Sequence, residues 1–171
     1  MSGHPSGDAS LVVLSERITQ SAAFDALFRE GMDLVEETAA YLDGAGRVEA
    51  KALERAVSLT YATESMRLTT RLMQVASWLL LHRAVKEGEM TLSQANREKT
   101  KVKLTAADPA GADVLEKLPA QLQDLVARSM MLQAKVRRLD TTIHSVPGGQ
   151  KSVGNPLVPQ LNRLKAAFES Q

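Results

Sequence analysis

The sequence has no cysteine among its 171 residues, and this absence excludes disulfide bonds, thiolate catalysis and cysteine-based metal sites. Aromatic residues make up only 4% of the chain, which is too few for the stacking platforms that bind nucleic-acid bases. An excess of one charge is also missing, because 21 Lys and Arg face 20 Asp and Glu and leave a net charge of +1. A dedicated nucleic-acid binder would need excess positive charge, so the balance argues against that class.

Long apolar runs and targeting signals are missing too. The longest uncharged apolar stretch runs from Leu72 to His82 and has an arginine on each side. As a helix it spans roughly 16 Å, about half of a bilayer core. The first residues lack the basic start and the long apolar stretch of a signal peptide. We therefore expect a cytoplasmic protein with a buried helix in this stretch.

The residues that are present have the composition of one globular domain, with 44% hydrophobic and 24% charged residues. We expect a flexible N-terminal arm over 1–20, a helical bundle domain over 21–146 and a flexible C-terminal tail over 147–171. The last boundary is expected because the segment 147–160 holds three Pro and three Gly and cannot continue a helix.

Apolar residues between 21 and 146 recur at spacings of three and four, which is typical of amphipathic helices. The first helix is expected to begin after Ser21 and to end at the glycines of 43–46. A long helix is expected over 48–86, a short one over 91–104, and a last one over 115–143 with Pro119 near its start. The fold class is therefore all-α: an elongated antiparallel bundle of three main helices plus one short helix.

The long second helix carries two apolar rows, so it should be covered from two sides. One row reads Ala52, Ala56, Leu59, Thr63, Met66, Thr70, Met73, Ser77 and Leu80, and the other reads Tyr61, Leu68, Leu72, Val75 and Leu79. The first helix is roughly 33 Å long and the second roughly 58 Å, so the first covers only about half of the second. We expect a second copy of the chain to supply the missing cover, as a homodimer. The candidate dimer interface consists of Leu68, Leu72, Val75, Trp78 and Leu79.

No pattern in the sequence is typical of an enzyme. The three histidines, His4, His82 and His144, have no partners at metal-binding helical spacing. The glycine pairs do not form a phosphate-binding loop, and no Gly-x-Ser-x-Gly motif is present. We therefore expect no catalytic residues, no cofactor and no metal site.

Three charged residues, Glu64, Arg67 and Arg71, lie within the apolar part of the second helix. Their favoured interpretation is a set of structural ion pairs with one another and with the acidic first helix, because unpaired buried charges are costly. The alternative is a recognition patch for another protein. A further set of apolar residues in the tail supplies candidate contacts for a partner that orders the tail on binding: Leu157, Val158, Leu161, Leu164 and Phe168.

Two segments, VEETAAYLDG (Val35–Gly44) and YATESMRLTTRLMQVASWLLLHRAVKEGEMT (Tyr61–Thr91), carry a resemblance to a known family. They resemble the core of the alphaproteobacterial family of regulators of CtrA degradation. The close resemblance covers roughly 24–104, and the C-terminal helix fits in order and length.

The resemblance implies an adaptor in regulated proteolysis that helps deliver the cell-cycle response regulator CtrA, and other substrates, to the ClpXP protease. It further implies a CpdR-like response regulator and a PopA-like cyclic-di-GMP effector as partners, recruitment to a cell pole, and no catalytic residues. Two other classes remain open: a structural helical dimer that acts as a scaffold, and a nucleic-acid-associated regulator. The second would use a basic face formed by Arg97, Lys99, Lys101 and Lys103, although a solvated face is the favoured interpretation.

Overall fold

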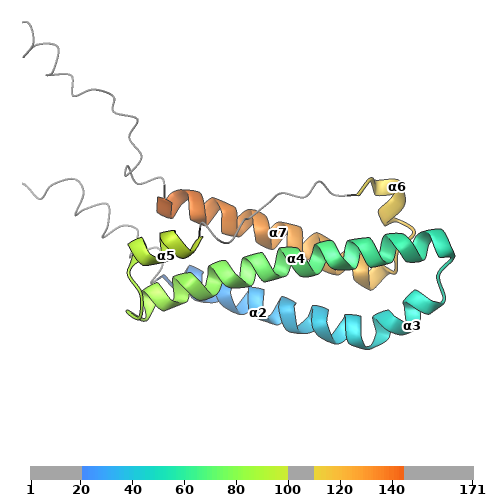
Figure 1. Cartoon of the computed structure of the whole chain (residues 1–171), viewed down its shortest axis with the longest axis horizontal. Helices are drawn as coiled ribbons and strands as arrows, with labels where there is room; N and C mark the ends of the chain where they lie inside the picture. The colour runs from blue at the N-terminus through green and yellow to red at the C-terminus, as the bar shows by residue number, and fades with distance from the viewer. Residues whose placement is uncertain (1–20, 100–109, 145–171) are drawn as a thin grey trace, which may run out of the picture.

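The computed structural model describes residues 21–99 and 110–144, and the secondary structure within these two ranges is entirely α-helical. Three long helices, α2 (Ala22–Asp43), α4 (Arg55–Lys86) and α7 (Ala120–His144), lie side by side in an elongated bundle (Figure 1). Three short helices, α3 (Ala45–Lys51), α5 (Leu92–Lys99) and α6 (Ala112–Leu115), connect them. The expected all-α class with three main helices is confirmed.

The directions of the three long helices differ from the expected antiparallel arrangement. Helix α2 runs antiparallel to both of the others, whereas α4 and α7 run parallel (Figure 1). Two pairs of contacts establish this: Arg71 bonds to Ser129, and Trp78, further along α4, bonds to Asp140, further along α7. The parallel arrangement is possible because α5, which follows α4, lies at one end of the bundle, and α6, which precedes α7, lies at the other end (Figure 1).

Helix boundaries agree with local signals in the sequence at three ends. The hydroxyl of Ser21 accepts a hydrogen bond from the backbone N–H of Phe24 and caps α2. Thr91 and Gln94 exchange backbone and side-chain bonds of 2.9 and 3.1 Å before α5, which is the expected capping box. Pro119 precedes the first turn of α7, and its carbonyl accepts from the N–H of Gln123. Residues 100–104 of the expected short helix lie outside the described residues.

The long second helix begins at Arg55 rather than at Val48 as expected. The separate short helix α3 precedes it, and the phenol of Tyr41 donates to Glu49 of that helix over 2.7 Å. A Cβ atom at Gly46 would lie 2.6 Å from the hydroxyl of Tyr61, so α3 approaches the bundle closely at this glycine. Burial and the bond to Glu49 both raise the pKa of Tyr41, which therefore stays a neutral donor.

The core lies between the facing rows of the three long helices. Helix α2 contributes Phe24, Leu27, Leu34 and Tyr41, α4 contributes Tyr61, Leu68, Leu72, Val75, Trp78 and Leu79, and α7 contributes Leu122, Leu125, Val126, Leu132, Val136 and Ile143. Helices α2 and α4 approach closely at Gly31, where an added Cβ would lie 2.5 Å from Cδ1 of Leu79. None of the described helices is long and apolar enough to cross a membrane.

Candidate functional site

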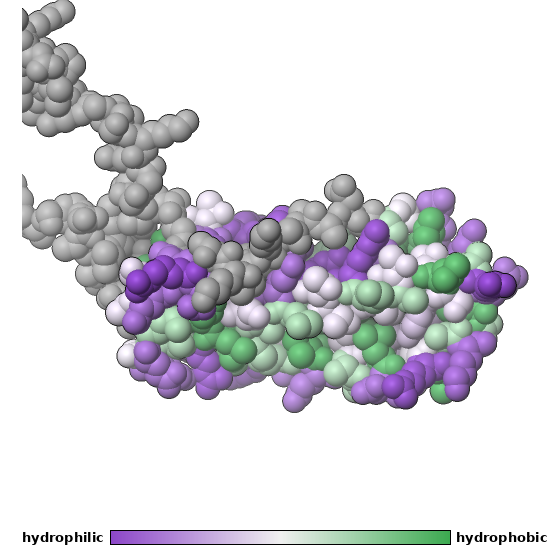
Figure 2. Space-filling model, in the orientation of Figure 1, coloured by the Kyte–Doolittle hydropathy of each residue, from purple (hydrophilic) through white to green (hydrophobic). Residues whose placement is uncertain are grey.

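The outer face of α4 exposes a row of large apolar side chains. Leu59, Met66, Met73 and Leu80 are spaced seven residues apart, and between 53% and 72% of each side chain remains accessible. They correspond to one of the two apolar rows that the sequence placed on this helix. Figure 2 shows the result as a band of hydrophobic and weakly polar residues that runs lengthwise over α4, between hydrophilic margins. An apolar band of this length on a surface is typical of an interaction site.

Small hydroxyl residues lie on the exposed side of α4, and four of their hydroxyls bond within the helix. The hydroxyls of Thr60, Thr63, Thr69 and Ser77 each donate to the backbone carbonyl four residues earlier, over 2.8–3.3 Å. A partner that covers this face therefore leaves these four hydroxyls bonded, so the polar cost of burying them is small. Small residues also allow another helix to approach closely.

The five residues that the sequence placed in a dimer interface are core residues instead. Leu68, Leu72, Val75, Trp78 and Leu79 are each at most 4% exposed in a single chain. They pack against α2 and α7, and a side chain that is buried inside its own chain has no surface left for a second copy. The expectation of a seam at these five positions was wrong, because the two apolar rows of α4 have the same period and only one of them faces the bundle.

The charged cluster in α4 is divided between the surface and the core. Glu64 is buried and accepts a 2.9 Å ion pair from the half-exposed Arg67. Arg71 is also buried, and its Nη1 donates to Oγ of Ser129 in α7 over 2.8 Å. Burial lowers the pKa of the Arg71 guanidinium, while the nearby Glu64 carboxylate acts in the opposite direction. The cluster therefore links α4 to α7, which favours the structural interpretation over an open recognition patch.

The acidic residues of α2 form their ion pairs with basic residues other than Arg67 and Arg71. Glu37 forms a two-oxygen ion pair with Arg128 of α7, at 2.7 and 2.8 Å, and Glu30 pairs in the same way with Lys135. Asp25 pairs with Lys86 of α4. The basic face near α5 is partly occupied too, since Lys99 pairs with Asp140 over 2.7 Å. Lys101 and Lys103 lie outside the described residues.

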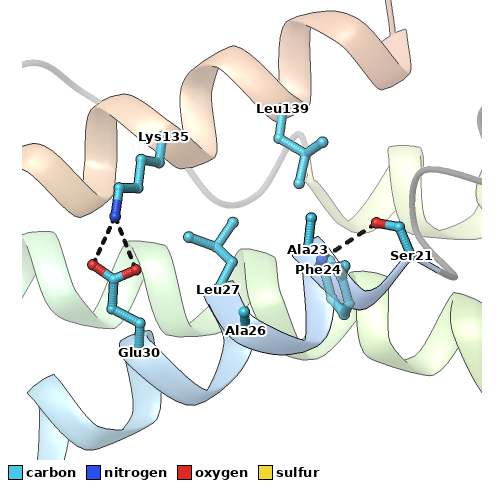
Figure 3. Close-up of a pocket in the computed structure, with 8 residues that line it drawn as sticks. All are labelled: Ser21, Ala23, Phe24, Ala26, Leu27, Glu30, Lys135 and Leu139. Atoms are coloured by element: carbon cyan, nitrogen blue, oxygen red, sulfur yellow. Dashed lines mark hydrogen bonds and ion pairs between the residues drawn. The ribbon is translucent and has the colours of Figure 1, made fainter.

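Two apolar cavities lie along α2, one on each side of it. The first, of about 670 Å³, lies between α2 and α7, and Figure 3 shows Phe24, Leu27 and Leu139 in its wall. The ion pair between Glu30 and Lys135 bounds this cavity at one side, and Ser21 lies at the other (Figure 3). The second, of about 270 Å³, lies between α2 and α4.

Within residues 21–99 and 110–144, no group of three His, Asp or Glu side chains is placed to hold a metal ion. The candidate tail contacts Leu157, Val158, Leu161, Leu164 and Phe168 lie outside the described residues, as do the arm over 1–20 and the tail over 147–171. The described residues form three candidate interaction surfaces: an apolar face on α4 and two cavities beside α2.

Comparisons with known proteins agree on one family. The family model described as "Protein of unknown function (DUF1465)" matches residues 15–168. The crystal structure of RcdA from Caulobacter crescentus CB15 is 51% identical in sequence, with a TM-score of 0.63, and the match covers 76% of this chain and 98% of that chain. No curated protein matches the chain. The family resemblance seen in the sequence is therefore confirmed, and the chain belongs to the family of RcdA-like proteins that the DUF1465 model describes.

Proposed function

We propose that this protein is a non-catalytic adaptor in regulated proteolysis, which helps deliver CtrA and other substrates to the ClpXP protease. Its similarity to RcdA over nearly all of that chain supports the assignment, together with the sequence resemblance to regulators of CtrA degradation. The structural observation that carries the proposal is the exposed, uncharged face of α4, because a large apolar surface is typical of a protein that binds other proteins. We propose further that it acts in the cytoplasm with a CpdR-like response regulator and a PopA-like effector, at a cell pole.

An adaptor works by tethering, which raises the local concentration of substrate at the protease without new chemistry. It should therefore lower the apparent KM for the substrate more than it raises the maximal rate. The test is reconstituted degradation of CtrA by ClpXP and the two partner proteins, with and without this chain. The control is a protease substrate that needs no adaptor, whose degradation should not change. An unchanged KM for CtrA, or acceleration that persists when CtrA is saturating, would contradict tethering.

We also propose that the chain forms a homodimer through the outer face of α4. The row from Leu59 to Leu80 reads nearly the same in both directions: Leu59, Thr63, Met66, Thr70, Met73, Ser77 and Leu80. An antiparallel pairing of two copies then brings Leu59 of one copy to Leu80 of the other, which suits the self-complementary contact of a two-fold dimer. The row is about 32 Å long, enough for several turns of helix packing.

Sedimentation at micromolar concentration tests the dimer. Wild-type protein should sediment as a dimer, and the double variant Met66→Glu/Met73→Glu should sediment as a monomer with unchanged helicity, because both side chains are exposed in the single chain. Met131→Glu is the matched control, since Met131 is exposed to a similar extent but lies on α7. A monomeric wild type, or a dimeric double variant, would contradict this interface.

We also propose that the C-terminal tail contacts a partner protein through the apolar residues between Leu157 and Phe168. Truncation after Val146 should leave helicity and melting nearly unchanged and weaken delivery of at least one substrate. Unfolding of the truncated chain would place the tail in the core, and normal delivery of every substrate would exclude it as the contact.

A further inference from the structure

The cavity between α2 and α4 has the size and lining of a site for one or two apolar side chains. Its volume of about 270 Å³ lies just below the range of about 300–1,000 Å³ that is usual for small-molecule pockets. Its lining is mostly aliphatic: Val35, Thr38, Ala39, Leu42 and Asp43 of α2, and Thr69, Leu72, Met73 and Ala76 of α4. Its α2 lining comes from the C-terminal half of that helix, which spans Ala22–Asp43.

A buried hydroxyl in the wall of this cavity lacks a hydrogen bond. Thr38 is 3% exposed, and its Oγ1 has no partner among the described residues. Thr69, in the opposite wall, instead donates to the carbonyl of Ser65 over 2.8 Å. A helical threonine has two accessible χ1 rotamers, so a change of rotamer can turn Oγ1 of Thr38 toward the cavity. A ligand that offers a polar atom there relieves the cost of an unbonded buried hydroxyl.

The α4 side of the cavity is adaptable. Met73 lines the cavity and also belongs to the α4 face proposed for the dimer, and most of its side chain is exposed in the single chain. Methionine has three rotatable bonds and a polarisable sulfur, so it packs against side chains of different shapes. The cavity therefore suits an aliphatic anchor whose identity varies from one partner to another.

The α2 side of the cavity is acidic. Among the described residues, Glu36 forms no ion pair, in contrast to Glu30 and Glu37 on the same helix. Asp43 lines the cavity and, within the described ranges, pairs only with Arg47 one turn further on, over 3.3 Å between two largely exposed side chains. Such an exposed pair is weak and easily exchanged. The available charge beside the cavity is negative, which is complementary to Lys or Arg on a ligand.

From these observations we propose that the groove between α2 and α4 binds a short peptide segment of a partner protein, with one or two large aliphatic side chains next to Lys or Arg. The aliphatic side chains enter the cavity, a backbone polar atom bonds Oγ1 of Thr38, and the basic side chains lie along Glu36 and Asp43. A second copy of the chain is a poorer occupant, because it would bring a second acidic α2 toward the first. The biological purpose of this peptide site rests on the proposed adaptor role, but the binding itself is tested without protease.

The test measures fluorescence polarisation of a labelled twelve-residue peptide with two leucines four positions apart and four lysines. Two control peptides replace both leucines by glutamine or all lysines by glutamate. Only the first peptide should bind the full chain well, and each control should bind at least about tenfold more weakly. If the three peptides bind alike, or if none binds, the proposal is overturned.

Matched variants of the full chain locate the binding site. Ala39→Phe fills the cavity and should weaken binding of the leucine–lysine peptide at least about tenfold, whereas Ala40→Phe, about 100° further round the helix, should change it less than about twofold. Glu36→Lys should weaken binding more than Asp33→Lys. Both alanines are exposed, and circular dichroism melting checks that each variant is folded.

Equal binding by the two phenylalanine variants would overturn the proposal. The proposal would also be overturned if no peptide binds and Ala39→Phe changes the sedimentation of the chain. That result would show that a second copy of the chain occupies the cavity. Since no assay here contains protease or CtrA, a peptide that binds while degradation is unaffected would leave the groove supported and contradict the adaptor role alone.

Discussion

The indole N–H of Trp78 donates a hydrogen bond to Oδ1 of Asp140 over 2.8 Å and so joins α4 to α7. Trp78 is buried in the core, and Asp140 lies half-buried at its edge. The other carboxylate oxygen of Asp140 accepts an ion pair from Lys99 of α5 over 2.7 Å. One side chain on α7 therefore ties three helices together.

Loss of the Asp140 carboxylate should destabilise the bundle. Asp140→Ala leaves the buried indole N–H of Trp78 without this acceptor, which costs about 1–3 kcal/mol. Asp140→Asn keeps an oxygen acceptor and should cost less. Urea unfolding measures both, and Asp124→Ala, at an exposed ion pair, is the control with an expected change within about 0.5 kcal/mol. An alanine variant as stable as the wild type would show that the hydrogen bond makes no net contribution to the free energy of unfolding.

The close approach of α2 to α4 should make Gly31 intolerant of any side chain. A Cβ at Gly31 would lie 2.5 Å from Cδ1 of Leu79, which is fully buried and has little room to move. Gly31→Ala should therefore lower the free energy of unfolding by about 1–3 kcal/mol. In a background of Leu79→Ala the same substitution should cost much less, because the clash is gone. Additive losses in this double-mutant cycle would contradict the explanation.

The unbonded hydroxyl of Thr38 should be dispensable for folding. Thr38→Val replaces a buried polar atom without a partner by a methyl group of similar size, and it should raise the free energy of unfolding by up to about 1–3 kcal/mol. Thr69→Val removes a hydroxyl that is bonded and exposed, and it serves as the control with little expected effect. Chemical denaturation of both variants measures the difference. A valine variant clearly less stable than the wild type would show that Thr38 has a partner in solution.

Acid should remove the contribution of the Glu37–Arg128 pair. Hydrogen bonds from Arg128 hold the pKa of Glu37 below its ordinary value of 4.5 in the folded chain. A lowered folded pKa stabilises the fold above the unfolded pKa, and this stabilisation is lost as the pH falls through the folded pKa. Because both side chains are more than 40% exposed, the effect is about 0.2–1 kcal/mol.

Comparison of wild type with Glu37→Gln measures this pair. The wild type should be more stable at neutral pH, and the difference should shrink toward zero as the pH falls through the lowered folded pKa of Glu37. Glu36→Gln, at a neighbouring carboxylate with no ion pair in the described structure, should differ little from the wild type throughout. A difference for Glu37→Gln that does not depend on pH would exclude the charge pair as its cause.

Local signals in the sequence determined where most helices lie. The cap at Ser21, the capping box at Thr91 and Gln94, and Pro119 before the last helix act over one turn, so they can be recognised without knowledge of the fold. The apolar periods likewise predicted three long helices. The break between α3 and α4 was missed, because the apolar period continues across it; in the folded chain α3 packs closely against the bundle at Gly46, beside Tyr61.

The apolar pattern of α4 predicted two faces but not which of them is inside. Both rows repeat every three or four residues, and a period carries no information about the partner. The tertiary structure decided the question, because the row with Leu68, Leu72 and Leu79 fits between α2 and α7. The row with Met66 and Met73 therefore stays on the surface, where the candidate interaction face lies. The cavity beside it also depends on two helices that are distant in sequence.

The direction of α7 could not be predicted from the sequence either. A helical period reads the same in either direction, so it predicts a face and not an orientation. Helix α5 follows α4 at one end of the bundle, α6 precedes α7 at the other end, and α7 therefore lies parallel to α4 (Figure 1). This direction brings Ser129 to Arg71 and Asp140 to Trp78. The sequence by itself determined the helices and their apolar faces, because those depend on neighbours along the chain. The tertiary structure alone decided the surfaces, because these depend on which helices cover one another.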